Sequence, residues 1–248
     1  MRQQLGRGPL RPALNALSVV VALCCLIVTG AAGAQTIKDA RYADPTTRYA
    51  HGVLGDAIEH ETLLLTLSDG RTVRMVLPES AVFEDTAPRL VDLDGDGSPE
   101  VVVVESDQTR GARLAVYDSV GRIDATPYIG TRNRWLAPIG AADLDGDGFM
   151  EIAYIDRPHL AKTLRIWRYA NRALTHVADM PGVTNHRIGE RDIAGGIRIC
   201  ADNPEIIVAT ANWSQILAVT FDGARFNQTS LNANTSRIEF AAAMACKY

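Results

Sequence analysis

A repeated acidic motif constrains this chain more than any other feature of its sequence. Residues 92–100 read DLDGDGSPE and residues 143–151 read DLDGDGFME, so the two copies begin 51 residues apart. Each copy runs directly into an apolar stretch, VVVV in the first and IAYI in the second. A weaker third copy begins near Asp192; its segment ADNPEIIVATANW places Glu205 before an apolar run, and the aspartate loop is lost. Self-similarity at this period indicates repeated supersecondary units.

A second element recurs between the acidic motifs. Four segments each contain an alternating apolar run, a short polar turn with Gly or Asn, and another run. They begin at Thr62, Ala112, Thr163 and Gln215. This pattern predicts β-hairpins, with Asp69-Gly70 and Asp222-Gly223 as the clearest turns. No long stretch of helical periodicity competes with it.

One repeat therefore predicts a strand, an acidic loop, a second strand and a hairpin. Four strands in about 50 residues are the unit of a β-propeller blade. We expect an all-β propeller over residues 35–248 with about four four-stranded blades, or five if residues 37–60 and 232–248 complete another. A β-sandwich with decorated loops is the alternative.

Residues 1–34 predict a secretory signal peptide. Three arginines precede the uncharged apolar stretch 17–29, and Ala32-Gly33-Ala34 has the small residues of a cleavage site. The stretch is short for a membrane span, which needs about 20 residues, although an uncleaved anchor is the alternative. Cleavage would leave 22 basic and 29 acidic residues in an exported protein, periplasmic or extracellular, with no membrane span. A net charge of −7 gives no reason to expect nucleic acid as a partner.

Cleavage would also leave two cysteines, Cys200 and Cys246. In an oxidising compartment two remaining cysteines favour a disulfide, which would tie the C-terminus to the last repeat. Two free buried thiols are the alternative.

The acidic motifs place carboxylates at positions 1, 3, 5 and 9 of a tight loop, with glycine at position 6 for the turn. Calcium prefers six to eight oxygen ligands at flexible geometry, and the position-7 carbonyl supplies one more. The predicted ligands of two calcium sites are Asp92, Asp94, Asp96, Ser98, Glu100, Asp143, Asp145, Asp147, Phe149 and Glu151. Magnesium is disfavoured because it prefers fewer carboxylates and more water. A solvated acidic turn is the alternative.

The segments DLDGDGSPEVVVVE and DLDGDGFMEIAYI resemble the FG-GAP/VCBS repeats of integrin-α-like β-propellers, including bacterial exported proteins. The resemblance implies that each acidic loop joins the first two strands of a blade and binds calcium. It covers two repeats well, a third only through its strands, and the first only through its hairpin.

Three linkers between the repeats also resemble one another and are predicted to lie on the face opposite the acidic loops. They read GTRNRW, GVTNHRIG and NANTSR. Propellers usually bind ligands through loops near the central channel. The candidate contacts are Asn133, Arg134, Trp135, Asn185, His186 and Arg187, which suit a carboxylate-bearing, glycan or peptide ligand. Capping of loops and wedging between blades is the alternative.

The sequence has no G-x-S-x-G, H-E-x-x-H, P-loop or G-x-G-x-x-G motif, so no catalytic residue is assigned. We expect a non-enzymatic, calcium-stabilised module that binds a protein or glycan. One alternative is a polysaccharide hydrolase or lyase, with His159 near Asp156 and Lys162 as an acid–base group on the linker face. Another is a subunit that completes a larger ring by oligomerising.

Overall fold

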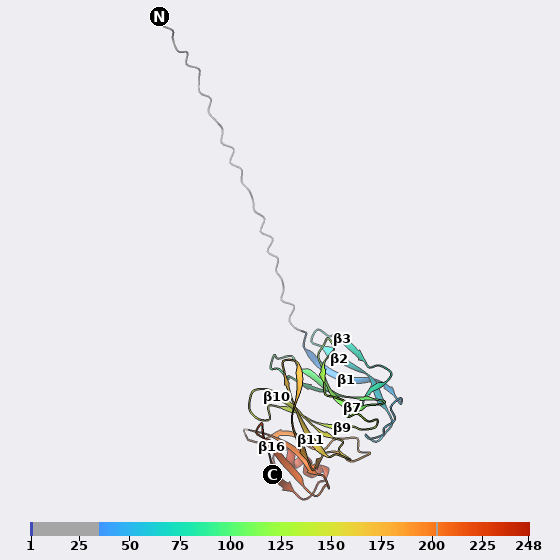
Figure 1. The fold of residues 1–248 in the computed structure, drawn as a ribbon, viewed down its shortest axis with the longest axis vertical. Coiled ribbons are helices and arrows are strands. Elements are labelled where there is room, and N and C mark those ends of the chain that lie inside the picture. Colours follow the sequence, from blue (N-terminus) through green and yellow to red (C-terminus); the bar gives the residue numbers. More distant parts are fainter. Residues whose placement is uncertain (2–34, 202) are drawn as a thin grey trace. The chain divides into compact units, whose positions relative to one another are not determined.

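The computed structural model describes Met1, residues 35–201 and residues 203–248 (Figure 1). The chain divides into Met1–Gly33 and a compact unit, Ala34–Tyr248, which holds every described strand and helix. Except for Met1, the predicted signal peptide at residues 1–34 lies outside the described residues. Within the described residues, no helix has the length and apolar character needed to cross a membrane.

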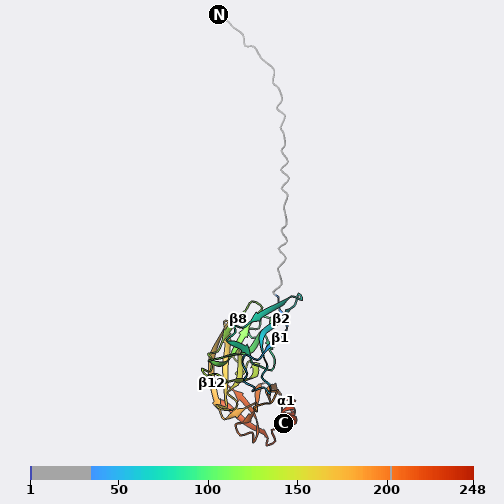
Figure 2. The ribbon, with the colours of Figure 1, turned by 90° about the vertical axis from the view of Figure 1, so that its right-hand side faces the viewer.

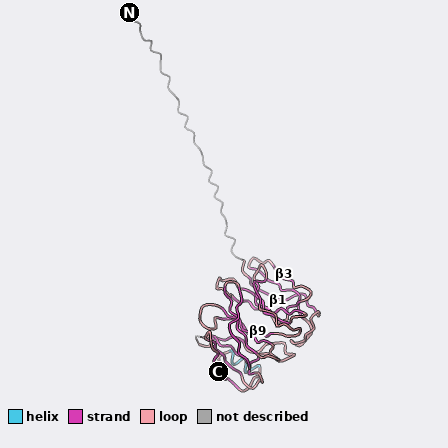
Figure 3. Tube along the Cα trace, in the orientation of Figure 1, coloured by secondary structure: helices cyan, strands magenta, loops and turns pink. Residues whose placement is uncertain are grey.

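Strands dominate the compact unit, which confirms the all-β prediction (Figure 3). The first three form an antiparallel meander: β1 (Ile37–Thr46), β2 (Glu59–Leu67) and β3 (Thr72–Val76). The predicted turn Asp69-Gly70 joins β2 to β3. Gly70 has a φ of +85°, in the left-handed region that glycine adopts at little cost.

The second group of strands pairs antiparallel around a long buried strand, β6. Its members are β4 (Ala81–Phe83), β5 (Arg89–Val91), β6 (Glu100–Asp107), β7 (Gly111–Tyr117) and β8 (Arg122–Ala125). Strand β7 pairs with one edge of β6. Strands β4 and β5 pair with the other edge, each at one end of β6. They are therefore one first strand that is interrupted at residues 84–88. Because β4 also pairs with β2, strands β1–β8 form one eight-stranded sheet.

A four-stranded antiparallel meander follows, and its first strand is continuous. It consists of β9 (Leu136–Ala142), β10 (Met150–Asp156), β11 (Thr163–Ala170) and β12 (Ala173–Pro181). The register of β9 against β10 shifts between Ala153 and Tyr154. This array has the predicted order of strand, acidic loop, strand and hairpin.

The last array repeats the interrupted first strand. It consists of β13 (Val183–Thr184), β14 (Gly196–Ile199), β15 (Pro204–Thr210), β16 (Ile216–Phe221) and β17 (Phe226–Asn232). Strands β13 and β14 pair with opposite ends of one edge of β15, and residues 185–195 leave the sheet between them.

All four predicted hairpins are present, as β2–β3, β7–β8, β11–β12 and β16–β17. The described residues contain three arrays of blade-like order after the first meander. No closed sheet occurs in this part of the chain, so the propeller and its blade count stay predictions.

Neighbouring arrays pack face to face, which explains the continuous apolar runs of the sequence. All eight residues of β6 are buried. Val101 and Val103 pack against the β1–β3 meander, whereas Val102 and Val104 pack against β9–β12. A further hydrophobic cluster joins β9–β12 to β13–β17. A strand that is covered on both faces reads as a continuous rather than an alternating apolar run.

The C-terminal segment does not complete a blade, contrary to the expectation for residues 232–248. It forms the helix α1 (Arg237–Met244), which is labelled beside the C-terminus in Figure 2. The segment is rich in alanine, a strong helix former, and the Ser236 side chain caps its N-terminus. Phe240 and Ala243 are buried in a cluster with residues of β15 and β16. The helix therefore covers the outer face of the last array.

The predicted disulfide is present between Cys200 and Cys246, whose Cα atoms are 5.6 Å apart. Cys200 directly follows β14, and Cys246 lies just beyond α1. The bond fastens the helix to the array that it covers. Both cysteines are exposed, so a reductant can reach them.

We expect Cys246→Ser to lower the stability of the protein and to loosen α1. The disulfide closes a loop with a sequence separation of 46 residues. Loop-closure entropy for such a loop is worth about 4 kcal/mol. Thermal unfolding with and without reductant measures the loss, and hydrogen exchange locates it in α1. Reductant should leave the variant unchanged; equal melting temperatures for the oxidised and reduced wild type would contradict the prediction.

Candidate functional site

Both predicted metal loops join the first and second strands of an array, and both have the same hydrogen-bonded structure. The Asp92 carboxylate accepts the backbone N–H groups of Gly95 (2.9 Å) and Gly97 (3.0 Å). The same two bonds recur at Asp143, with lengths of 2.8 and 3.0 Å. The loop conformation is therefore held by its own first aspartate.

A buried glutamate closes each loop from the second strand. Glu100 accepts the N–H of Leu93 and Glu151 accepts that of Leu144, each over 2.9 Å. Burial is the main cause that raises the pKa of both glutamates. A cation among the carboxylates would oppose this rise, because a nearby positive charge favours the ionised form.

The carboxylates of each loop converge. In each loop, three oxygens from different side chains lie within 4.8 Å of one another. The contributing residues are Asp92, Asp94 and Asp96 in the first loop and Asp143, Asp145 and Glu151 in the second. A set of carboxylate oxygens at this spacing fits a hard cation such as calcium.

The residues predicted to add a carbonyl ligand follow the third aspartate of each loop. The N–H of Ser98 donates to Asp96 over 2.7 Å, and that of Phe149 donates to Asp147 over 3.0 Å. These bonds fix the turn at which the two carbonyls would be presented. Calcium ligation by either loop stays a prediction.

The second loop already contains a positive charge from the protein itself. Arg168 on β11 is the register partner of Glu151 on β10. Its guanidinium contacts Asp145 at 2.6 Å, Asp147 at 2.8 Å and Glu151 at 2.7 Å. It thereby contacts three of the four carboxylates that were predicted as metal ligands, and its single positive charge offsets part of their negative charge.

In the first loop, no arginine of the described residues occupies the corresponding place. In the first array, Val101 pairs with Tyr117, so Asp118 lies next along the chain, opposite Glu100. Asp118 therefore occupies the position that Arg168 occupies opposite Glu151 in the second acidic loop's array. Asp118 is itself acidic, and it pairs with Arg172 at 2.6 Å. Among the described residues, no basic side chain forms an ion pair with the four carboxylates of this loop.

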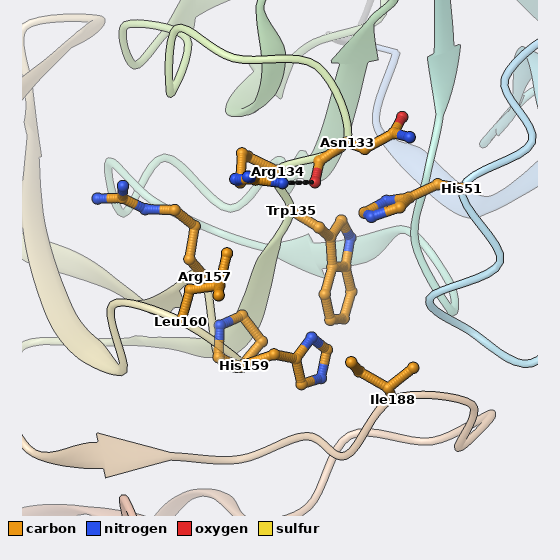
Figure 4. Close-up of a pocket in the computed structure, with 9 residues that line it drawn as sticks. His51, Asn133, Arg134, Trp135, Arg157, His159, Leu160 and Ile188 are labelled. Atoms are coloured by element: carbon orange, nitrogen blue, oxygen red, sulfur yellow. Dashed lines mark hydrogen bonds between the residues drawn. The ribbon is translucent and has the colours of Figure 1, made fainter.

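A pocket of about 210 Å³ is formed by several of the loops that the sequence places away from the acidic motifs (Figure 4). It lies among the β1–β2, β8–β9, β10–β11 and β13–β14 connections. The lining residues are His51, Asn133, Arg134, Trp135, Arg157, Pro158, His159, Leu160 and Ile188. Segments of three arrays and of the first meander therefore meet here.

One wall of the pocket rests on a buried carboxylate. Glu84 lies in the interruption between β4 and β5, and its side chain has no exposed surface. It contacts Nδ1 of His51 at 2.6 Å and accepts a hydrogen bond from Ser106. Its backbone carbonyl accepts the indole N–H of Trp135 over 2.8 Å. Burial raises the pKa of Glu84, and the hydrogen bond from His51 opposes that rise.

The imidazole of His159, which also lines the pocket, is oriented by the imidazole of His186. His186, almost fully buried, has Nε2 at 2.8 Å from the backbone carbonyl of Glu190. A carbonyl only accepts, so this nitrogen carries the proton and Nδ1 of neutral His186 accepts from Nε2 of His159, 3.0 Å away. Burial, followed by the charges of His186 and His51, lowers the pKa of His159 to about 4. His159 is therefore neutral at neutral pH, with Nδ1 unprotonated.

The structure brings four of the six predicted ligand contacts together. Asn133, Arg134 and Trp135 line the pocket, and the ring of His186 lies 4.9 Å from that of Trp135. The other two lie elsewhere. Asn185 is fully buried and donates to a backbone carbonyl of β9, and Arg187 stacks on Trp213 with 3.8 Å between the guanidinium carbon and the ring centre. Ligand binding by any of them stays a prediction.

Sequence reasoning missed three important residues. His51 and Glu84 lie outside the repeated linkers, and no periodic pattern marks them. Arg168 was detectable in principle, because antiparallel pairing of two neighbouring strands places it opposite Glu151. His159 was named only as a candidate acid–base group, and the structure places it in the pocket.

We expect His159 to stay unprotonated down to about pH 4, because its pKa lies well below that of an ordinary histidine. Between the unfolded pKa near 6.5 and the folded value, the unfolded chain binds a proton that the folded chain does not. His159 thus makes stability fall as pH falls through this window. A nitrogen-detected NMR titration measures the pKa of His159. Protonation of the His159 ring near pH 6.5 would contradict the prediction.

Comparison with known proteins gave one match to a protein family. Residues 92–154 match the model of the FG-GAP-like repeat, and this segment runs from the first acidic loop into β10, through the second acidic loop. A search of curated protein sequences found no significant match.

Among solved structures, the chain is similar to the crystal structure of the V. cholerae biofilm matrix protein Bap1. The identity is 12% and the TM-score is 0.23, over 71% of this chain and 32% of that one. This chain thus spans about one third of that protein, and a likeness at this score carries no conclusion about fold or function. The resemblance drawn from the two acidic motifs is confirmed by the family match: residues 92–154 are an FG-GAP-like repeat.

Proposed function

We propose that residues 35–248 are an exported, calcium-stabilised binding module of the β-propeller type, with its ligand site on the side opposite the acidic loops. The observation that carries the proposal is the identical hydrogen bonding of two acidic loops, each followed by a buried strand. The FG-GAP-like repeat supports a binding or interaction role. The disulfide between exposed cysteines is consistent with export.

Electrostatic repulsion is the reason for placing calcium in the first loop. Three of its carboxylates have oxygens within 4.8 Å of one another. Two like charges at about 4 Å repel by roughly 1 kcal/mol in water and roughly 4 kcal/mol near a protein surface. Because no basic side chain of the described residues forms an ion pair with this loop, a bound divalent ion is the simplest way to stabilise this arrangement, and all-oxygen ligation favours calcium.

The two loops differ in what a metal ion must displace. In the second loop, Arg168 has to leave three carboxylates before an ion can occupy their centre. Its ion pairs and the cost of moving its side chain reduce the net gain from binding. We therefore assign the tighter calcium site to Asp92–Glu100 and a weaker one to Asp143–Glu151.

The stacking of successive arrays supports a propeller-type arrangement. The three arrays after the first meander are antiparallel, and hydrophobic clusters join the meander to the first array, the first array to the second and the second to the third. Three such arrays are few for a closed ring, which keeps assembly with further copies as a structural alternative. Light scattering of the purified protein decides between a monomer and a ring of several copies.

One observation favours the enzymatic alternative, a polysaccharide hydrolase or lyase. Buried Glu84 holds His51 in one orientation, and this is how many enzymes position a general base. None of the described residues that line the pocket is a serine, threonine or cysteine that could act as a nucleophile. A broad polysaccharide turnover screen of wild type and His51→Ala tests this alternative; binding without turnover favours the module.

We expect calcium to raise the melting temperature and a chelator to lower it. An ion at one hundred times its dissociation constant contributes about 2.7 kcal/mol. For a chain of this size that is roughly 5 to 10 °C. Asp94→Asn should abolish most of the shift, whereas Asp145→Asn should abolish less, because the second loop binds calcium more weakly. Identical melting curves in calcium and chelator would contradict the structural role of the ion.

We expect Arg168→Gln to strengthen calcium binding at the second loop by at least about tenfold, while it destabilises the calcium-free protein. The substitution removes the competing cation and leaves buried Glu151 unpaired. Calorimetric titration should then resolve two tight sites instead of one tight and one weak site. Arg165→Gln on the same strand, whose partners are Asp156 and Asp179, is the matched control. Unchanged affinity in Arg168→Gln would contradict the assignment.

A further inference from the structure

We propose that the histidine-lined pocket binds one carboxylate-bearing sugar ring, such as a uronic acid residue of a glycan. The proposal rests on the proposed function, because it names the ligand class of that binding module. It needs four properties of the pocket: a preformed shape, one uncompensated positive charge, oriented hydrogen-bonding groups and apolar walls.

The pocket arises where the regular arrays are interrupted. Glu84 lies in the break between β4 and β5, and His186 and Ile188 lie in the break between β13 and β14. Asn133 and Arg157, which line the pocket, have φ values of +52° and +45°, in the left-handed region that favours glycine. Departures from regular geometry cost free energy and concentrate at functional sites.

These strained backbones are held in place by neighbouring groups. The N–H of Asn133 donates to the hydroxyl of buried Tyr49 over 3.0 Å. The N–H of Arg157 donates to the carbonyl of Trp135 over 3.0 Å. The pocket therefore has its shape before a ligand arrives, which lowers the ordering cost of binding.

The charge in the pocket suits a ligand with one negative charge. Arg157 forms two parallel bonds of 2.9 Å with the carboxylate of Asp156, so its charge is compensated. The Arg134 guanidinium donates to the backbone carbonyl of Asn133 and pairs with no carboxylate among the described residues. One free guanidinium matches one carboxylate, with which it can form two parallel hydrogen bonds. A dianionic phosphate would leave a charge unmatched.

Two imidazole nitrogens are available for hydroxyl groups. Glu84 occupies Nδ1 of His51, and His186 occupies Nε2 of His159. The other nitrogen of each ring forms no hydrogen bond with a described residue. Figure 4 shows both rings beside the indole of Trp135. Because their partners are buried, these nitrogens have fixed directions, as recognition of a hydroxyl requires.

The remaining walls are apolar and the volume is small. Pro158, Leu160 and Ile188 line the pocket, and Leu160 and Ile188 are 62% and 72% exposed at its rim. A volume of about 210 Å³ lies below the roughly 300–1,000 Å³ of sites for drug-sized ligands. The space therefore suits one ring, with its carbon face on the apolar wall and its polar edge towards Arg134 and the imidazoles.

The test compares D-glucuronate with D-glucose, which differ only in the carboxylate, by calorimetric titration of the full chain in saturating calcium. We expect glucuronate to bind at least about tenfold more tightly, because its carboxylate can form charge-assisted hydrogen bonds with Arg134, which are stronger than hydrogen bonds between neutral groups. Equal affinity for the two sugars, or no saturable binding of glucuronate, would overturn the proposal. So would tighter binding of inorganic phosphate than of glucuronate.

Variants locate the binding in the pocket. Arg134→Gln should reduce glucuronate affinity to that of glucose, whereas Arg134→Lys, which keeps the charge, should retain a preference. Arg132→Gln is the matched control, since Arg132 is an exposed arginine of the same linker that does not line the pocket. Calcium-dependent melting of each variant confirms that it folds. Unchanged glucuronate binding in folded Arg134→Gln would place the ligand elsewhere.

The same variants separate this proposal from the binding-module function. A glycan and peptide array tests wild type and Arg134→Gln side by side. An array ligand could still be captured by Arg134→Gln, without competition from glucuronate. That result would overturn only the assignment of the ligand to the pocket. No capture of any ligand, together with no effect of calcium on melting, would overturn the function itself.

Discussion

Burial of the second strand of each array on both of its faces is the constraint on which the rest of the fold depends. Strand β6 is buried at every residue, and alternate valines of this strand belong to different hydrophobic clusters. Such a strand keeps its register, because a shift by one residue would exchange the two sets of contacts. Its two ends are consequently fixed in space. The acidic loops precede β6 and β10 at one end, and at the other end the loop that follows β10 contributes residues 157–160 to the pocket.

The molecule compensates buried acidic groups in different ways at these two ends. In the second acidic loop, an arginine from the neighbouring strand contacts three carboxylates, whereas the first loop has the same hydrogen-bonded backbone and no such ion pair within the described part of the chain. Near the pocket, an imidazole and a hydroxyl satisfy the buried Glu84. A buried carboxylate is costly unless it is paired, so each partner is a structural requirement as well as a candidate functional group.

The pocket depends on departures from the repeat rather than on the repeat itself. The middle array, β9–β12, has an uninterrupted first strand, and its two neighbouring arrays do not. The residues that leave the sheet carry Glu84 on one side and His186 on the other. Regular pairing at these positions would satisfy the backbone but would leave no space for a ligand. The linker that precedes β9 then lies between the two interruptions. It contains Asn133 to Trp135, which were predicted as ligand contacts from the linker pattern.

The sequence alone determined the all-β class, the four hairpins, the two acidic loops and the disulfide between Cys200 and Cys246. These follow from local patterns, because turn chemistry, alternation and loop spacing act over a few residues and recur in each repeat. Only the tertiary structure decided that β4–β5 and β13–β14 are interrupted strands, that the C-terminal segment is a helix, and that Arg168 lies among the carboxylates of one loop. It also decided that His51 and Glu84 join His159 at one pocket. All except the helix, whose alanines and Ser236 cap are local signals, depend on contacts between segments distant in sequence, such as His51 with Glu84, 33 residues apart. No local sequence pattern indicates which distant side chain will pair with a buried charge.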